Sequence, residues 1–165
     1  MKKFILITAL VISTLSMTAQ ESNVSLSGAL PTGDAGDVTT FGLNLDLNYL
    51  WAVAEQFDLG LTAGYHHYFG EDIDLEGFGT VEAEDFGFLP IAAAARFNAT
   101  EQFTIGADVG YAIGLNPDGN DGGFYYAPKV QYGLTPLIDI VLSYRGVSLD
   151  GGSFDALSLG FEFGL

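Results

Sequence analysis

Residues 41–53, FGLNLDLNYLWAV, place an apolar side chain at every second position, and mostly glycine, asparagine or aspartate stand between them. Residues 103–115, FTIGADVGYAIGL, repeat this pattern with small residues in the intervening positions. Successive side chains of a β-strand point to opposite faces of the sheet. Each stretch therefore predicts a strand with one apolar face and one small or polar face.

The same alternation predicts eight strands, which turn-forming residues separate. The expected strands cover residues 22–30, 39–53, 57–69, 86–97, 103–115, 124–134, 138–147 and 154–165. The segment 86–97 is the least regular, because Pro90 and the alanine run at 92–95 blur its period. Alanine favours helix, but a helix starting at this run would end after a few residues. We therefore predict a strand with a local irregularity at Pro90.

The predicted connections alternate in length. Residues 54–56, 98–102 and 135–137 form tight turns, whereas the other connections are longer and rich in glycine and aspartate. Short turns at one end and long loops at the other are typical of outer-membrane barrels, in which both chain ends lie on the periplasmic side. The expected fold is therefore all-β: an eight-stranded antiparallel up-and-down transmembrane β-barrel with short periplasmic turns and longer extracellular loops.

The N-terminus has the composition of a secretory signal peptide. Lys2 and Lys3 precede an apolar run at 4–15, and small residues up to Ala19 offer a cleavage site. The run is shorter than the roughly 20 apolar residues of a membrane-spanning helix, although a retained anchor is the alternative. We expect a cleaved signal peptide at 1–20 and one barrel domain at 21–165. The chain has no cysteine, so neither disulfides nor a cysteine-ligated metal is expected.

The charge balance limits the partners that this chain can bind. Its formal net charge is −16, and residues 21–165 keep only Arg96, Lys129 and Arg145 against 21 acidic residues. A protein that binds nucleic acid needs cations to neutralise phosphates. We therefore expect no nucleic-acid partner.

The composition of the second strand face decides whether lipid or water surrounds the barrel. In a lipocalin-like barrel that face meets water and would be rich in charged residues. Here it consists largely of glycine, asparagine, serine and threonine, which suit a narrow lumen. Aromatic residues also gather near both strand ends, as expected at two membrane interfaces. The group near the turns comprises Tyr49, Trp51, Phe57, Phe97, Phe103, Phe161 and Phe163, and the group near the loops comprises Tyr65, Phe69, Phe86, Phe88, Tyr126 and Tyr144.

The C-terminal stretch 157–165, LSLGFEFGL, alternates to the last residue and resembles the strand that outer-membrane proteins present to the barrel-assembly machinery. With the signal peptide, the alternation and the loop asymmetry, the chain resembles the OmpA-like and OmpX-like β-barrel superfamily over its whole mature length. The stretches MTAQ at 17–20 and LTAGY at 61–65 are similar to those of Bacteroidetes outer-membrane barrels. The resemblance implies location in the outer membrane of a Gram-negative bacterium, with membrane lipid, lipopolysaccharide and the assembly machinery as partners.

A group of charged residues falls on the predicted inner face. We expect this lumen charge network to comprise Asp46, Asp108, Lys129, Asp139, Arg145 and Glu162. Unpaired charges in a narrow lumen are costly, so Lys129 is expected to pair with Asp108, and Arg145 with Glu162 or Asp139. Such a network favours a plug that fills the barrel. The alternative is a gate that admits small ions.

Two further features suggest chemistry outside this network. The 70–85 loop is a candidate divalent-cation loop, with Glu71, Asp72, Asp74, Glu76, Glu82, Glu84 and Asp85 as its oxygen donors. The alternative is a solvated charged loop. His66 and His67 are the only histidines, and alternation places His66 in the lumen and His67 outside, so they cannot share one metal.

The enzymatic relatives of this superfamily, lipid A deacylases and palmitoyltransferases, combine a histidine with a serine and a carboxylate or amide. The deacylase pattern places a serine two residues after its histidine, whereas Tyr68 and Phe69 occupy those positions here. We therefore expect a non-enzymatic protein. The resemblance implies an outer-membrane barrel with a structural or surface-interaction role, and the charge network predicts a lumen plugged by polar and charged side chains. The protein should need no cofactor beyond weakly held Ca²⁺ or Mg²⁺. A narrow porin-like ion channel is the second hypothesis, and a lipid A-modifying enzyme is the third.

Overall fold

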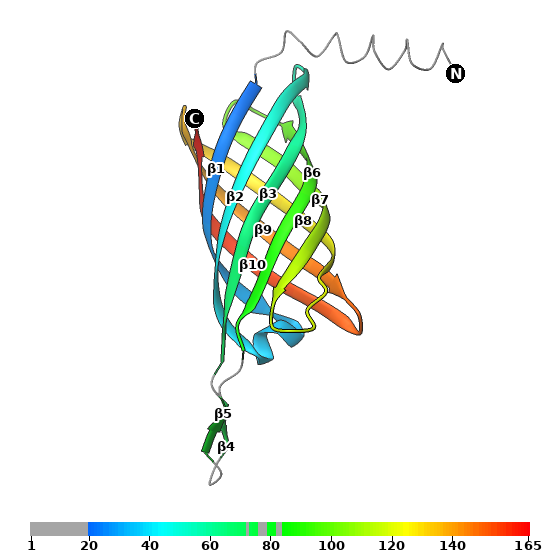
Figure 1. Cartoon of the computed structure of the whole chain (residues 1–165). Helices are drawn as coiled ribbons and strands as arrows, with labels where there is room; N and C mark the ends of the chain where they lie inside the picture. Colours follow the sequence, from blue (N-terminus) through cyan, green and yellow to red (C-terminus); the bar gives the residue numbers. More distant parts are fainter. Residues whose placement is uncertain (1–19, 72, 76–78, 82–83) are drawn as a thin grey trace, which may run out of the picture.

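The computed structural model describes residues 20–71, 73–75, 79–81 and 84–165, so residues 1–19 of the predicted signal peptide lie outside the described part. Eight long strands of this part close into one antiparallel barrel in the order β1-β10-β9-β8-β7-β6-β3-β2 (Figure 1). These strands are β1 (Gln20–Thr32), β2 (Thr39–Ala54), β3 (Phe57–Gly70), β6 (Phe86–Asn98), β7 (Phe103–Asn116), β8 (Gly123–Thr135), β9 (Ile138–Leu149) and β10 (Gly152–Gly164). The predicted fold class is confirmed.

The barrel closes where its first strand pairs with its last. Val24 of β1 lies opposite Phe163 of β10, and the antiparallel ladder continues from there to Thr32 opposite Asp155. The start of β1 and the end of β10 therefore meet at one end of the barrel, which we call the turn end. The tight turns after β2, β6 and β8 also lie there, and the other end, the loop end, carries the longer connections.

Two short elements at the loop end differ from the sequence prediction. Residues Gly33–Asp37 form a 3₁₀ turn, η2, after β1. The predicted 70–85 loop contains a hairpin of β4 (Ile73–Leu75) and β5 (Gly79–Val81), which projects beyond the barrel (Figure 1). Three residues per strand are too few for a clear period of two, so the alternation could not reveal this hairpin. No helix in the part of the chain that the structure describes has the length and hydropathy needed to cross a membrane.

The two faces of the wall differ sharply in exposure and composition. On β2, Leu45 and Leu47 are 46% and 57% exposed, whereas the intervening Asp46 is 3% exposed. The other strands show the same arrangement. Large apolar side chains are exposed on the outside of the barrel, and polar side chains are buried inside it. Soluble proteins rarely expose apolar patches of this size. The outer face of the barrel therefore has the composition expected of a surface in contact with lipid.

The predicted positions of Phe86 and Phe88 are wrong. Both were expected in the outer aromatic group, but Phe88 is fully buried inside the barrel and Phe86 packs against the same interior cluster. Ile91 and Ala93 face outward, which places the even-numbered residues of β6 inside. The alanine run hides this phase in the sequence, because small residues are compatible with either face.

Candidate functional site

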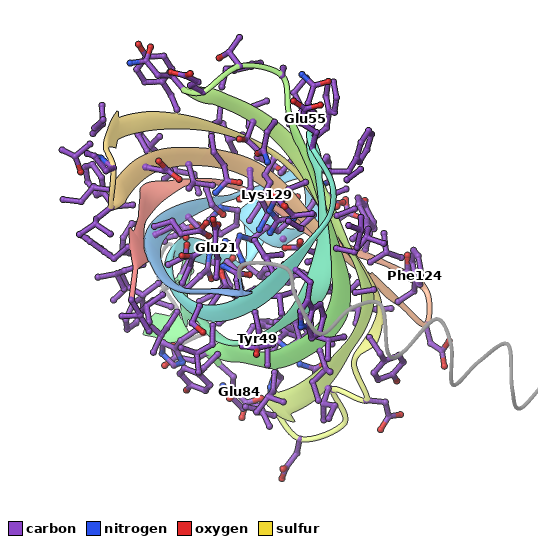
Figure 2. All side chains as sticks on the ribbon, turned by 90° about the horizontal axis from the view of Figure 1, so that it is seen from above. Glu21, Tyr49, Glu55, Glu84, Phe124 and Lys129 are labelled. Atoms are coloured by element: carbon purple, nitrogen blue, oxygen red, sulfur yellow. The ribbon has the colours of Figure 1, made fainter. Side chains whose placement is uncertain are left out.

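The lumen is the candidate functional site, because it gathers most of the buried polar side chains of the described residues. Figure 2, viewed down the barrel from the turn end, shows Lys129 and Glu21 within the ring of strands and Phe124 outside it. Three inward-facing side chains of β8 mark three levels of the lumen, from the loop end to the turn end. Along it, Tyr125 meets Arg145, Lys129 meets Asp108, and Gln131 meets Glu162.

The layer below the loop end joins Asp46, His66 and Arg145 from β2, β3 and β9. Asp46 Oδ1 lies 2.8 Å from His66 Nε2, and Asp46 Oδ2 lies 2.8 Å from Arg145 Nη2. Arg145 Nη1 is 2.9 Å from the same His66 nitrogen and donates a longer bond of 3.4 Å to the Tyr125 hydroxyl. All of these side chains are buried. The carboxylate thus balances the guanidinium and orients the imidazole.

The middle layer is an ion triplet in which one carboxylate serves two cations. Arg96 Nη1 lies 2.7 Å from Asp108 Oδ1, and Lys129 Nζ lies 2.5 Å from Asp108 Oδ2. Arg96 Nη1 also donates to the backbone oxygens of Ala95 and Ala107. The Arg96 side chain passes over Gly106, where an added Cβ would come within 2.6 Å of Arg96 Cδ. Glycine at this position therefore makes room for the guanidinium.

The layer toward the turn end holds a carboxylate through amides rather than cations. Glu162 Oε2 accepts a 2.7 Å hydrogen bond from Asn48 Nδ2, and Glu162 Oε1 accepts a 2.8 Å bond from Gln131 Nε2. Asn48 and Glu162 stand on β2 and β10, which are separated by β1. This contact therefore passes over β1 on the inner face of the barrel and ties non-adjacent strands together.

An aromatic layer covers the polar layers at the loop end. Phe154 of β10 packs against Tyr68 and Phe88, with its ring centroid 4.6 and 5.2 Å from theirs, and the ring centroid of Phe86 also lies 5.2 Å from it. Phe154, Tyr68 and Phe88 belong to one buried cluster, which also contains Tyr125, and Phe86 is partly buried against it. Aromatic side chains therefore pack against one another at the loop end of the lumen.

The three layers contain as many fixed positive as negative charges. Their cations are Arg96, Lys129 and Arg145, and their acids are Asp46, Asp108 and Glu162, each at most 5% exposed. Buried charges are tolerated when they are paired and hydrogen-bonded. Several other buried atoms of the described lumen have no hydrogen-bond partner, among them Thr62 Oγ1, Asn48 Oδ1 and Arg96 Nε and Nη2.

The structure places most residues of the expected network inside the barrel, but one ion pair differs from the predicted one. Arg145 was expected to reach Glu162 or Asp139, and it pairs with Asp46 instead. Glu162 is engaged by the two amides, and Asp139 forms no salt bridge with any described residue. Arg145 and Asp46 lie in the layer nearer the loops, whereas Glu162 lies nearer the turns, which is the physical reason for the difference.

Sequence reasoning missed Arg96 as a member of the lumen layers and did not connect His66 with its partner. Arg96 escaped because the alanine run obscured the phase of β6, yet counting back from Phe97 as an outward aromatic residue would have placed it inside. His66 was correctly assigned to the lumen but was not connected to Asp46. The two stand on neighbouring strands, and the register places His66 opposite Asn44, one inward position away from Asp46.

The acidic loop does not form a metal site among the described residues, in which no group of three or more potential ligands is arranged around one point. Asp85 is already engaged, because its Oδ1 accepts a bond from the Gly70 amide and its Oδ2 lies 3.1 Å from His67 Nε2. Glu71 and Glu84 are exposed. The predicted ligands Asp72, Glu76 and Glu82, and the side chain of Asp74, lie outside the described residues.

Comparison with known proteins supports the architecture. Residues 6–164 match a family model described as outer membrane protein beta-barrel domain, whereas no curated protein matches the sequence. The chain is 18% identical to Yersinia pestis Ail in a phospholipid nanodisc, with a TM-score of 0.62 over 89% of this chain and 100% of Ail. The N-terminal barrel of Pseudomonas aeruginosa OprF gives 13% identity and a TM-score of 0.54 over 88% and 97% of the two chains. The crystal structure of Yersinia pestis Ail in complex with the heparin analogue sucrose octasulfate gives 16% identity and a TM-score of 0.51, over 88% of this chain and 97% of Ail.

Proposed function

This chain belongs to the outer membrane protein β-barrel family, and we propose that it is a structural and surface-interaction protein of the Gram-negative envelope with a lumen closed to ions. On this proposal the N-terminal signal peptide is cleaved on export. The barrel is then inserted by the assembly machinery, and outer-membrane lipid and lipopolysaccharide surround its wall. The loops face outward and the turns face the periplasm.

The observation that carries the closed lumen is the aromatic layer above the paired charges. Phe154, Tyr68 and Phe88 pack against one another within the ring of strands, and the Asp46–Arg145 pair lies next along the lumen. An eight-stranded barrel has an interior just wide enough for side chains. An ion would have to displace packed rings and then separate buried ion pairs, both of which are costly.

Conductance in planar bilayers tests the closed lumen. The purified protein should give no steady channels, and the double variant Phe88→Ala and Phe154→Ala should give more frequent openings because it removes two rings of the layer. Ala93→Ser, a small change on the outer face of β6, serves as the matched control. Steady channels in the unaltered protein that are lost on changing Lys129 or Arg145 would overturn the proposal.

One observation favours the second hypothesis, a narrow ion channel. The lumen keeps buried polar atoms without partners, including Thr62 Oγ1 and Asn48 Oδ1, and such atoms are commonly satisfied by water. A hydrated lumen is a requirement for conduction, but hydration alone does not open the aromatic layer. The conductance measurement above separates the two hypotheses.

The surface-interaction part of the proposal rests on the distribution of charge. Every lysine and arginine of residues 20–165 lies in the lumen, so the loop end presents acidic residues without fixed positive charge. The fold neighbour Ail was crystallised with a heparin analogue, but here acidic loops would repel such a polyanion. We therefore propose cationic or divalent-bridged partners. Retention on a heparin column at low ionic strength would contradict this.

We also propose that the protein has no enzymatic activity. His66 is buried against Asp46 and Arg145, and His67 lies against Asp85. Among the described residues, neither histidine is hydrogen-bonded to a serine that it could activate. Expression in a Gram-negative host should leave the mass of lipid A unchanged. A mass shift that disappears with His66→Ala would support a lipid A-modifying enzyme instead.

A further inference from the structure

The turn end of the barrel contains a polar pocket of about 210 Å³. It lies between the start of β1, the turn that joins β8 to β9, and the end of β10. The Gly164 amide donates a 3.0 Å hydrogen bond to the Leu137 carbonyl, and the Leu165 amide donates one of 2.9 Å to the Ser22 carbonyl. Backbone hydrogen bonds therefore hold the three segments together around the pocket.

Three carboxylates line this pocket without a cation beside them. Glu21 belongs to β1, Asp139 to β9 and Glu162 to β10, and Figure 2 shows Glu21 within the ring of strands. Asp139 and Glu162 lie directly opposite each other in the β9–β10 ladder, where like charges destabilise a sheet. None of the three forms a salt bridge with a described residue, because the lysine and both arginines of residues 20–165 pair with acids nearer the loop end.

Glu162 has the most deeply buried charge of the three. It is 4% exposed, and the side-chain amides of Asn48 and Gln131 hold its carboxylate without a countercharge. A buried carboxylate is costly unless a cation pairs with it. Asn48 is itself 3% exposed, and its Oδ1, on the amide group that holds Glu162, has no hydrogen-bond partner among the described residues. The inner end of the pocket thus collects acceptors and lacks a positively charged donor.

We propose that this pocket binds a primary ammonium group carried on a short alkyl chain. An ammonium group brings one positive charge and three hydrogen-bond donors, which match Glu162, Asp139 and the Asn48 oxygen. The alkyl chain then lies against Pro136 and Leu137 of the turn. The volume of about 210 Å³ equals that of about seven water molecules at roughly 30 Å³ each, which is enough for a four-carbon diamine.

A chelated metal ion is the competing cation, and the geometry does not favour it. Among the described residues, no group of three or more potential ligands is arranged around one point, whereas Ca²⁺ takes about six to eight oxygen ligands and Mg²⁺ demands near-octahedral geometry. Carboxylates on separate strands suit an ammonium group better, because its donors need only individual acceptors.

Two sources carry this chemistry, a free alkyl diamine and a lysine side chain of another protein. Only their location rests on the proposed function, which places the turn end in the periplasm. Binding itself depends on the pocket alone and does not require that the lumen conducts or stays closed.

Isothermal titration calorimetry of the purified protein in an uncharged detergent tests the proposal. The probes are diaminobutane, a short end-blocked peptide with one lysine, and tetramethylammonium, which has the charge but no N–H donor. The double variant Glu21→Gln and Asp139→Asn removes two carboxylates of the pocket that form no salt bridge with a described residue. The double variant Asp118→Asn and Asp121→Asn is the matched control, because it removes the same charge from exposed acids of the loop end. Heat-dependent gel mobility confirms that both variants are folded.

We expect one diaminobutane or one lysine peptide to bind per barrel, with the loop-end control unchanged. The pocket variant should bind at least about tenfold more weakly, and so should tetramethylammonium to the unaltered protein, since a hydrogen bond to a charged group contributes about that factor or more. Binding of the diamine alone identifies a free amine as the ligand, and binding of the peptide alone identifies a lysine side chain; either result supports the pocket.

Three results would contradict the proposal: no binding of either amine, equal weakening by the two double variants, or tetramethylammonium binding as tightly as the diamine. None of them changes the conductance expected of the unaltered protein. The pocket and the closed lumen can therefore fail independently.

Discussion

The substitution Asp108→Asn gives the most direct test of how the lumen is held together. Asp108 is the sole salt-bridge partner of both Arg96 and Lys129 among the described residues, at 2.7 and 2.5 Å. Asparagine keeps the shape of the side chain and one acceptor, but it removes the negative charge and leaves two buried cations side by side. Removing one partner of a buried ion pair costs about 3–5 kcal/mol. We expect the free energy of unfolding to fall by that amount.

Equilibrium unfolding in urea, with the protein refolded in lipid vesicles, measures this loss. Trp51 is the only tryptophan, and it faces outward near the turn end, so its fluorescence reports insertion of the barrel. Asp139→Asn is the matched control, since Asp139 is half-buried and forms no salt bridge with a described residue. Its cost should stay below about 1 kcal/mol.

A double variant separates loss of pairing from other effects of the substitution. Lys129→Gln removes one of the cations that Asp108→Asn leaves unpaired, so the combined cost should be smaller than the sum of the two single costs. Contacting charged residues show interaction energies of about 0.5–3 kcal/mol. A loss below about 1 kcal/mol for Asp108→Asn, or strictly additive costs, would refute the argument that this triplet stabilises the lumen.

Three further changes test separate features of the barrel. Gly106→Ala should lower the free energy of unfolding by about 1–3 kcal/mol, because its Cβ would press on Arg96, whereas Gly152→Ala, which meets no atom within 4 Å, should change it little in the same urea titration. Thr62→Val removes a buried hydroxyl without a partner and should be neutral within about 1 kcal/mol; a larger loss would show that the hydroxyl is satisfied. A divalent-cation site in the 70–85 loop predicts that millimolar Ca²⁺ slows protease cleavage there more than NaCl of equal ionic strength, and equal rates would argue against it.

The strands of this barrel could be predicted from the sequence because the alternation that defines each strand lies within a single short segment. Alternation within 41–53 already separates the two faces, and turn residues mark where each strand ends. The same rule fails where the inner and outer residues are equally small. In 92–95 every residue is alanine, so the phase of β6 was lost, and with it the inward position of Phe88 and Arg96.

The pairing inside the lumen could not be predicted in the same way, because it depends on contacts across the barrel. Asn48 and Glu162 lie 114 positions apart in the sequence and on strands that do not pair. Which side chains meet across the lumen is set by the stagger of the strands when the sheet closes. Alternation specifies that Arg145 points inward, but the height at which it finds Asp46 requires the closed barrel.

The division of charge between the two surfaces links these observations to function. Inside, the three layers hold Arg96, Lys129 and Arg145 with an equal number of buried carboxylates, so these layers carry no net fixed charge. At the loop end, the acidic residues have no lysine or arginine beside them in residues 20–165. A chain that placed its cations for binding would expose at least some of them. The structure therefore separates a lumen that holds the barrel together from an acidic loop end and an apolar wall, and partners in the membrane and outside the cell should be sought at these two outer surfaces.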